Sequence, residues 1–283
     1  MALSMTTDLT AQDETYKPGS ESQRQEGVPK GTVTQYTWHS KLLNNYRDYY
    51  IYVPAQYNAQ TPAALMVFQD GHAYVNENGD FRVPIVFDNL IHSGDMPVTI
   101  GVFINPGHNS KDYPQSLFSV SNRSNEYDEL SDSYVNFLTE ELIPEIKKKY
   151  NLSEDPKMHA IAGLSSGAIC AFTAAWQRPD YFHKVLSHIG SYTNIRGGHV
   201  YPFLIRRSSK KDIKIFLQDG SNDLNNIFGD WWLSNLQMES ALKFKGYEYS
   251  FAAGTGGHNG KHGGAILPES LKWLWSDVVK KGK

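Results

Sequence analysis

Residues 158–177 read MHAIAGLSSGAICAFTAAWQ and indicate a strand, a tight turn and a helix in direct succession. The apolar start of this stretch is typical of a buried strand, and its end has a helical composition. Between them, Gly163-Leu164-Ser165-Ser166-Gly167 matches the pattern G-x-S-x-G, whose glycines leave room around a strained turn. The pattern places the hydroxyl of Ser165, rather than that of Ser166, at the exposed tip of the turn. It also lies at a helix N-terminus, where the dipole favours developing negative charge.

Strand and helix patterns alternate on both sides of this unit. The expected strands are residues 32–38, 46–54, 64–68, 98–104, 158–162, 184–189, 213–218 and 247–252. The expected helices are residues 83–91, 131–150, 166–177, 230–245 and 266–279. Pro144 should bend the second of these helices. Because most of the strands are near-continuous apolar runs, the chain is predicted to have an α/β fold. Its central sheet should be mostly parallel, with helices on both faces.

The N-terminal segment differs in composition from the rest of the chain. Residues 1–31 are polar and aperiodic, which predicts a flexible N-terminal tail. Residues 32–283 carry the alternating pattern and should form a single α/β domain. The carboxyl ends of the parallel strands are then the place where a site is expected.

Composition excludes several classes of protein. The chain has 283 residues with 27 Lys+Arg and 30 Asp+Glu, a net charge of −3. This near balance gives no reason to expect nucleic acid or an anionic membrane as a partner. No stretch approaches the roughly 20 apolar residues of a membrane span. One cysteine excludes an internal disulfide and, without an HExxH pattern, we expect no metal and no cofactor. Nothing indicates an oligomeric state.

A serine hydroxyl becomes a good nucleophile only when a base takes its proton. In folds with this turn the chain order is serine, acid, histidine. His258 lies in the glycine-rich GTGGHN loop directly after the last expected strand, so it is the preferred base. His262 lies four residues further on and is the rival. His199 precedes the acid strand and breaks the order.

The acid should follow the expected strand 213–218. Asp219 ends that strand and could serve only to cap the turn. Asp230 opens an expected helix, where aspartate is a common N-cap. Asp223 lies on the loop between them and is preferred as the group that orients the imidazole and stabilises its charged form.

Acyl transfer also needs backbone N–H groups aimed at the developing oxyanion. One should come from Ser166, the residue after the nucleophile. The other should come from the loop after strand 64–68, which reads QDGHA. Gly71 lets the backbone approach closely there, and the N–H of His72 or Ala73 is the expected donor.

With these residues in place, the chain resembles the putative-esterase branch of the α/β hydrolases. This branch includes enterochelin esterases and the family-one carbohydrate esterases that act on feruloyl and acetyl groups. The resemblance runs from about Tyr46 to Trp275. It rests on the segments MVFQDG, TIGVFINPG, NRSNEYDELSDSYVNFLTEELIP, IAGLSSGA, QDGSND and GGHNGKHGG. By position it implies an α/β-hydrolase fold, with Ser165 as nucleophile, Asp223 as acid and His258 as base.

The resemblance implies a serine carboxylic ester hydrolase that works through an acyl-enzyme. Its expected substrates are feruloyl or acetyl groups on plant cell-wall polysaccharide. The alternatives are a siderophore esterase, an acyltransferase on the same fold, or a catalytically silent carbohydrate-binding protein. Relatives of this organisation are usually exported, so the mature form is expected to be secreted or periplasmic, and otherwise cytoplasmic.

Four further residues are candidates for substrate contact. Trp231 and Trp232 follow the acid loop and could line a pocket, although at least one of them should belong to the core. Arg123 could bind a carboxylate or phosphate, or equally pair with a neighbouring acid, Glu126 or Asp128. His262 remains a candidate here as well.

Overall fold

The computed structural model describes residues 15–112 and 121–279. Eight strands form one sheet in the order β1-β2-β4-β3-β5-β6-β7-β10. These strands are β1 (Thr32–Ser40), β2 (Asn45–Val53), β3 (Ala64–Gln69), β4 (Thr99–Ile104), β5 (His159–Leu164), β6 (Lys184–His188), β7 (Lys214–Gly220) and β10 (Glu248–Gly254). The expected strands are therefore confirmed in type and order. A short hairpin, β8 (Asn225–Asn226) and β9 (Gly229–Asp230), lies outside this sheet.

The six strands from β4 to β10 are parallel to one another, whereas β1 and β2 pair antiparallel at one edge. Each parallel connection needs a crossover, and helices supply most of them. The carboxyl ends of these six parallel strands therefore all lie at the same end of the sheet. The turns that follow β3, β5, β7 and β10 hold the candidate residues, so the topology alone brings them together.

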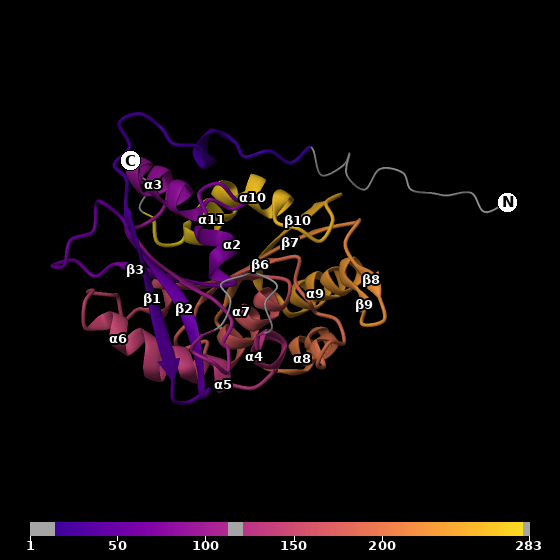
Figure 1. The fold of residues 1–283 in the computed structure, drawn as a ribbon. Helices are drawn as coiled ribbons and strands as arrows, with labels where there is room; N and C mark the ends of the chain where they lie inside the picture. Colours follow the sequence, from indigo (N-terminus) through magenta and orange to yellow (C-terminus); the bar gives the residue numbers. More distant parts are fainter. Residues whose placement is uncertain (1–14, 113–120, 280–283) are drawn as a thin grey trace.

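Helices cover both faces of the sheet (Figure 1). They are α2 (Gly71–Val75), α3 (Val83–Ser93), α4 (Arg123–Tyr127), α5 (Ser133–Asn136), α6 (Ile143–Lys147), α7 (Ser166–Gln177), α8 (Tyr201–Arg207), α9 (Trp231–Lys245), α10 (Lys261–Ala265) and α11 (Leu267–Trp275). Single turns of 3-10 helix lie at η1 (Ser20–Ser22), η3 (Pro156–Met158) and η4 (Gly198–Val200). Within the described ranges, every helix is too short or too polar to span a bilayer.

Successive side chains of β3 enter two different cores, as strand geometry requires. Val67 packs with α7 and its neighbours on one face, and Phe68 packs with Phe87 of α3 and the α11 side chains on the other. Both residues are fully buried. The strand is apolar throughout because both faces of the sheet are covered.

The helix expected over residues 131–150 contains a wider turn. A π-helical segment, η2 (Phe137–Leu142), joins α5 to α6 just before Pro144. Proline has no N–H and its ring crowds the carbonyl of the preceding turn. A change from i→i+4 to i→i+5 hydrogen bonding before the proline accommodates this ring. The helix also begins at Ser133 and ends at Lys147.

Part of the segment expected to be a tail packs on the domain. Asn89 of α3 donates hydrogen bonds to the carbonyls of Glu21 and Gln23. The Glu21 carboxylate pairs with Lys272 of α11 at 2.6 Å, and Arg24 pairs with Asp88. Residues 15–31 therefore contact the domain at several points. Residues 1–14 lie outside the described part of the chain.

Candidate active site

The turn between β5 and α7 has the geometry that its glycines predict. Ser165 has a φ of 56°, in a region of backbone conformation that residues other than glycine rarely adopt. A Cβ atom at Gly163 would lie 2.1 Å from the Gly167 carbonyl oxygen, and one at Gly167 would lie 2.8 Å from Asp70 Oδ2. Both positions therefore need glycine for the turn to close. The strain at Ser165 holds its side chain at the tip of the turn.

Three of the predicted residues meet in one chain of hydrogen bonds. Ser165 Oγ lies 2.8 Å from His258 Nε2, and His258 Nδ1 lies 2.5 Å from Asp223 Oδ1. The Asp223 side chain is fully buried and the ring of His258 is about one-fifth exposed. The loops that carry these two residues touch, because a Cβ atom at Gly220 would lie 2.1 Å from the carbonyl oxygen of Gly256.

The two rival acids have other partners. Asp230 accepts a hydrogen bond from the N–H of Leu233 and caps α9, as expected. Asp219 is fully buried, with its carboxyl group accepting from Gly220 N and from Asn235 Nδ2. Burial, and then the nearby Asp223 carboxylate, raise the pKa of Asp219 well above the usual range for aspartate.

Two other histidines near the carboxyl ends of the parallel strands, His262 and His188, contact groups outside the Ser165–His258–Asp223 chain. His262 Nδ1 lies 2.9 Å from Gln218 Nε2, and its ring stacks on Tyr16 at a centroid distance of 4.2 Å. His188 ends β6, and its Nδ1 lies 2.9 Å from the Tyr74 hydroxyl. Burial lowers the pKa of His188 to about 3, so it stays neutral near pH 7.

The loop after β3 corrects one expectation about the oxyanion site. The backbone N–H of His72 donates to Asn105 Oδ1 at 2.9 Å, and that of Ala73 donates to the Asp70 carbonyl. Neither group is free to bind an oxyanion in this conformation, which contradicts the expectation for both. Gly71 packs against the backbone of β4, since a Cβ there would lie 2.3 Å from Phe103 C. The backbone N–H groups of Gly71 and Ser166 are the remaining candidates for donating hydrogen bonds to the oxyanion.

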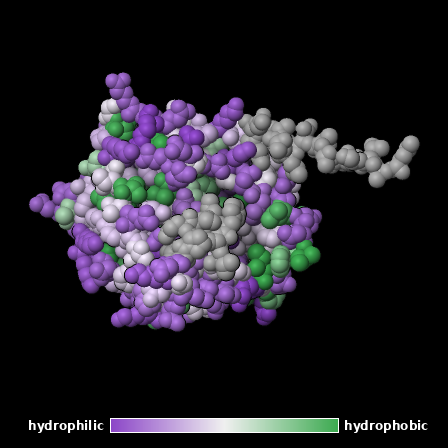
Figure 2. Space-filling view, in the orientation of Figure 1, coloured by the Kyte–Doolittle hydropathy of each residue, from purple (hydrophilic) through white to green (hydrophobic). Residues whose placement is uncertain are grey.

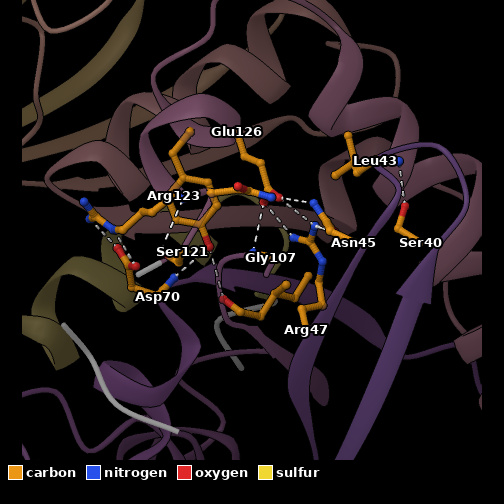
Figure 3. Close-up of polar contacts among 12 residues, drawn as sticks. Ser40, Leu43, Asn45, Arg47, Asp70, Gly107, Ser121, Arg123 and Glu126 are labelled. Carbon is orange, nitrogen blue, oxygen red and sulfur yellow. Dashed lines mark hydrogen bonds and ion pairs between the residues drawn. The ribbon is translucent and has the colours of Figure 1, made fainter. Parts of the chain in front are cut away.

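Arg123 pairs with an acid that the sequence did not suggest. Its Nε and Nη2 atoms donate to the two carboxylate oxygens of Asp70 at 2.8 and 2.6 Å (Figure 3). Of the two acids expected as alternatives, Glu126 and Asp128, the first instead pairs with the buried Arg47. Asp70 adjoins the serine turn through Gly167, so Arg123 braces this turn from the side.

The two tryptophans have different environments. Trp231 is 2% exposed, and its ring meets that of His258 edge-on at a centroid distance of 5.7 Å. Trp232 is half-buried and packs on Phe251 of β10. The expectation that at least one of the pair belongs to the core is confirmed for Trp231.

One residue at the site was missed. Ser191 follows β6, is 1% exposed, and places its Oγ 3.1 Å from Ser165 Oγ. No motif surrounds it in the sequence. Its only sequence signal is its place after a parallel strand, which many loop residues share.

A family model described as Putative esterase matches residues 40–273. This range is most of the chain. The chain belongs to the Putative esterase family. With its fold, this membership makes it a carboxylic ester hydrolase of the α/β-hydrolase type.

Solved structures of two kinds of esterase resemble this one. The enterobactin esterase of Shigella flexneri superposes with a TM-score of 0.72 at 20% identity, over 89% of this chain and 61% of that one. A CE1 ferulic acid esterase from Anaeromyces mucronatus superposes with a TM-score of 0.71 at 18% identity, over 90% and 95%. The likeness at these identities is one of fold.

A curated relative gives a similar picture. The iron(III) enterobactin esterase of Escherichia coli is 24% identical over 201 residues, which are 68% of this esterase and 46% of that protein. The esterase thus spans less than two thirds of the enterobactin esterases that it matches.

Proposed function

We propose that this esterase cleaves carboxylic esters through a Ser165–His258–Asp223 triad and an acyl-enzyme. The observation that carries the proposal is the continuous hydrogen-bonded path from the buried Asp223 through His258 to Ser165 on its strained turn. Asp223 fixes the tautomer of the imidazole, so Nε2 faces the serine as a proton acceptor.

The steps follow from these positions. Ser165 Oγ attacks the ester carbonyl while its proton passes to His258 Nε2. The N–H groups of Ser166 and Gly71 hold the oxyanion. His258 then gives the proton to the departing alcohol and the acyl-enzyme remains. Water attacks this ester with the help of His258, and Ser165 leaves with the proton returned.

We propose feruloyl or acetyl groups on plant cell-wall polysaccharide as the substrate, with the feruloyl ester preferred. Exposed apolar side chains gather over the β8–β9 hairpin and the start of α9 (Figure 2), namely Leu224, Ile227, Phe228 and Leu233. This surface adjoins the acid loop, since Leu224 follows Asp223 directly. An apolar surface beside the site suits an aromatic acyl group better than an acetyl group.

A siderophore triester is the second candidate. Its support is the likeness in fold and sequence to enterobactin esterases. The shared part covers 61% of the Shigella chain, so a siderophore triester ranks below a feruloyl ester. Export of the mature protein stays a prediction.

The test is to measure hydrolysis of methyl ferulate, acetylated xylan and a catecholate triester by the wild type and by Ser165→Ala. We expect methyl ferulate to be cleaved fastest, and the variant to lose about 10⁴-fold or more in kcat. Ser240→Ala, which changes an exposed serine on α9, is the matched control and should keep full activity. An added acceptor sugar separates hydrolysis from acyl transfer through the products. Substantial activity in Ser165→Ala would contradict the proposed nucleophile.

A further inference from the structure

A second hydroxyl, outside the proposed triad, contacts the proposed nucleophile. Ser191 Oγ lies 3.1 Å from Ser165 Oγ, and Trp231 Nε1 donates a hydrogen bond to Ser191 Oγ at 3.0 Å. Ser191 and Trp231 are both nearly fully buried, with exposed fractions of 1% and 2%. Three consecutive hydrogen bonds therefore join Trp231 to His258 through the two serines.

The direction of the bond between the two serines follows from the groups at the two ends of this path. At one end the indole N–H of Trp231 can only donate, so Ser191 Oγ accepts there and keeps its own proton to give. At the other end ionised Asp223 can only accept, so His258 Nδ1 donates and Nε2 accepts. Ser165 then donates to His258 and has only lone pairs left for Ser191. The triad end therefore requires that Ser191 donates to Ser165, and the bond from Trp231 leaves the Ser191 proton available for this.

We propose that Ser191 is a positioning residue that donates a hydrogen bond to Ser165 Oγ, and that Trp231 holds Ser191 Oγ in place for this bond. The inference rests on the proposed function. The Ser165 oxygen has one proton and two lone pairs. The proton goes to His258 and one lone pair accepts from Ser191, so a single lone pair remains to attack the substrate.

The hydrogen bond from Ser191 to Ser165 is strongest in the transition states of the reaction. Negative charge builds on Ser165 Oγ as its proton leaves for His258, and again when Oγ departs from the acyl group. A hydrogen bond to an oxygen gains strength as that oxygen becomes negative. The bond from Ser191 therefore favours the transition states over the ground state, which is the condition for raising kcat.

The backbone around Ser191 is built to hold it in place. Ile189, two residues earlier, has a φ of 45°, and a Cβ atom at Gly190 would lie 2.4 Å from the ring of Tyr192. The N–H of Ser191 donates to the carbonyl of Ser165, and Asn235 of α9 donates to the carbonyl of Gly190. The turn is thereby joined both to the serine turn and to the helix that carries Trp231.

The experiment compares Ser191→Ala, Trp231→Phe and the double variant on p-nitrophenyl acetate. Ser191→Ala should lower kcat about 10-fold and change KM less than about 2-fold, since the bond acts on the transition state. Trp231→Phe keeps the ring against His258 and removes the N–H, so kcat should fall about 3-fold. Because Trp231 acts through Ser191, the double variant should be no slower than Ser191→Ala by more than about 2-fold.

Ser187→Ala is the matched control. Ser187 is a buried serine of β6 whose hydroxyl pairs with Tyr192 at 3.0 Å, and it should leave kcat unchanged. Wild-type kcat in Ser191→Ala, or losses that multiply in the double variant, would overturn the inference. If Ser191→Ala fails to fold, wild-type kcat in Trp231→Phe overturns it equally. An active Ser165→Ala variant would instead contradict the proposed function itself.

Discussion

Two carboxyl groups with different environments lie side by side below the candidate histidine. Asp223 accepts from His258, whereas Asp219 accepts from Asn235 and from the backbone of Gly220. Burial, and then Asp223, raise the pKa of Asp219, so this group stays protonated near neutral pH. With Asp219 neutral, no second carboxylate of this pair competes with Asp223 for the imidazole, which is the distribution that the triad needs.

Exchange of each aspartate for asparagine should separate their roles. Asp219→Asn replaces a neutral carboxyl with a neutral amide, so kcat at pH 7 should stay within about 3-fold of the wild type. Asp223→Asn should lower kcat about 10⁴-fold, because the imidazole loses the partner that fixes its tautomer. Steady-state kinetics on one ester measures both. Equal losses in the two variants would contradict the assignment.

The raised pKa of Asp219 also sets a dependence of stability on pH. A group that binds its proton more tightly when folded stabilises the fold most at low pH. This contribution falls as pH rises from about 4, the value of an exposed aspartate, through the raised folded-state pKa. The difference in unfolding free energy between the wild type and Asp219→Asn should therefore decrease from pH 5 to pH 9 in urea titrations. A difference that is constant with pH would contradict a protonated Asp219.

At the scale of elements, the N-terminal segment reaches the loop that carries His258. Tyr16 stacks on His262, and its hydroxyl accepts a hydrogen bond from the N–H of Thr255 at 2.9 Å. The segment is polar and aperiodic, so the sequence alone predicts a tail. What holds residues 15–31 is a set of polar contacts with groups far along the chain, such as Lys272. Such contacts leave no local pattern to read.

Loss of the Tyr16 contacts should loosen the histidine loop. Tyr16→Ala should lower the free energy of unfolding by about 1–2 kcal/mol, because it removes one aromatic pair and the hydrogen bonds between Tyr16 and Thr255. Amide hydrogen exchange over residues 255–262 should become faster. Tyr16→Phe keeps the stacking on His262, so its free energy of unfolding should lie between those of the wild type and Tyr16→Ala. The neighbouring exposed Lys17→Ala is the control, and unchanged exchange in Tyr16→Ala would refute the contact's role.

Across the whole molecule, the predictable features were those with a local or periodic signal. Strands with continuous apolar runs, such as β3, were predicted in order, and the glycines around Ser165 identified the turn. His258 and Asp223 followed from chain order along parallel strands. Pairs set by tertiary packing could not be predicted, because nothing near Arg123 or Ser191 in the sequence points to Asp70 or Trp231.

A buried ion pair connects the antiparallel edge of the sheet to the site. Arg47 of β2 is fully buried and donates from both terminal nitrogens to Glu126 of α4, which also binds Asn45 and the N–H of Gly107 (Figure 3). The same helix begins with Arg123, whose pair with Asp70 braces the serine turn. The contacts between β2 and α4 therefore support the position of the site as well as the fold.

Removal of one partner of this ion pair should lower the stability of the whole fold. Arg47→Met leaves the Glu126 carboxylate buried without its cation, which should lower the free energy of unfolding by about 3–5 kcal/mol. The double variant Arg47→Met/Glu126→Leu should recover part of this loss, since no unpaired charge then remains. The exposed pair Arg178–Asp180 gives the control, because Arg178→Met should cost less than about 1 kcal/mol. Urea unfolding of the four proteins measures these differences. If Arg47→Met costs no more than Arg178→Met, the buried pair does not hold α4 against the sheet.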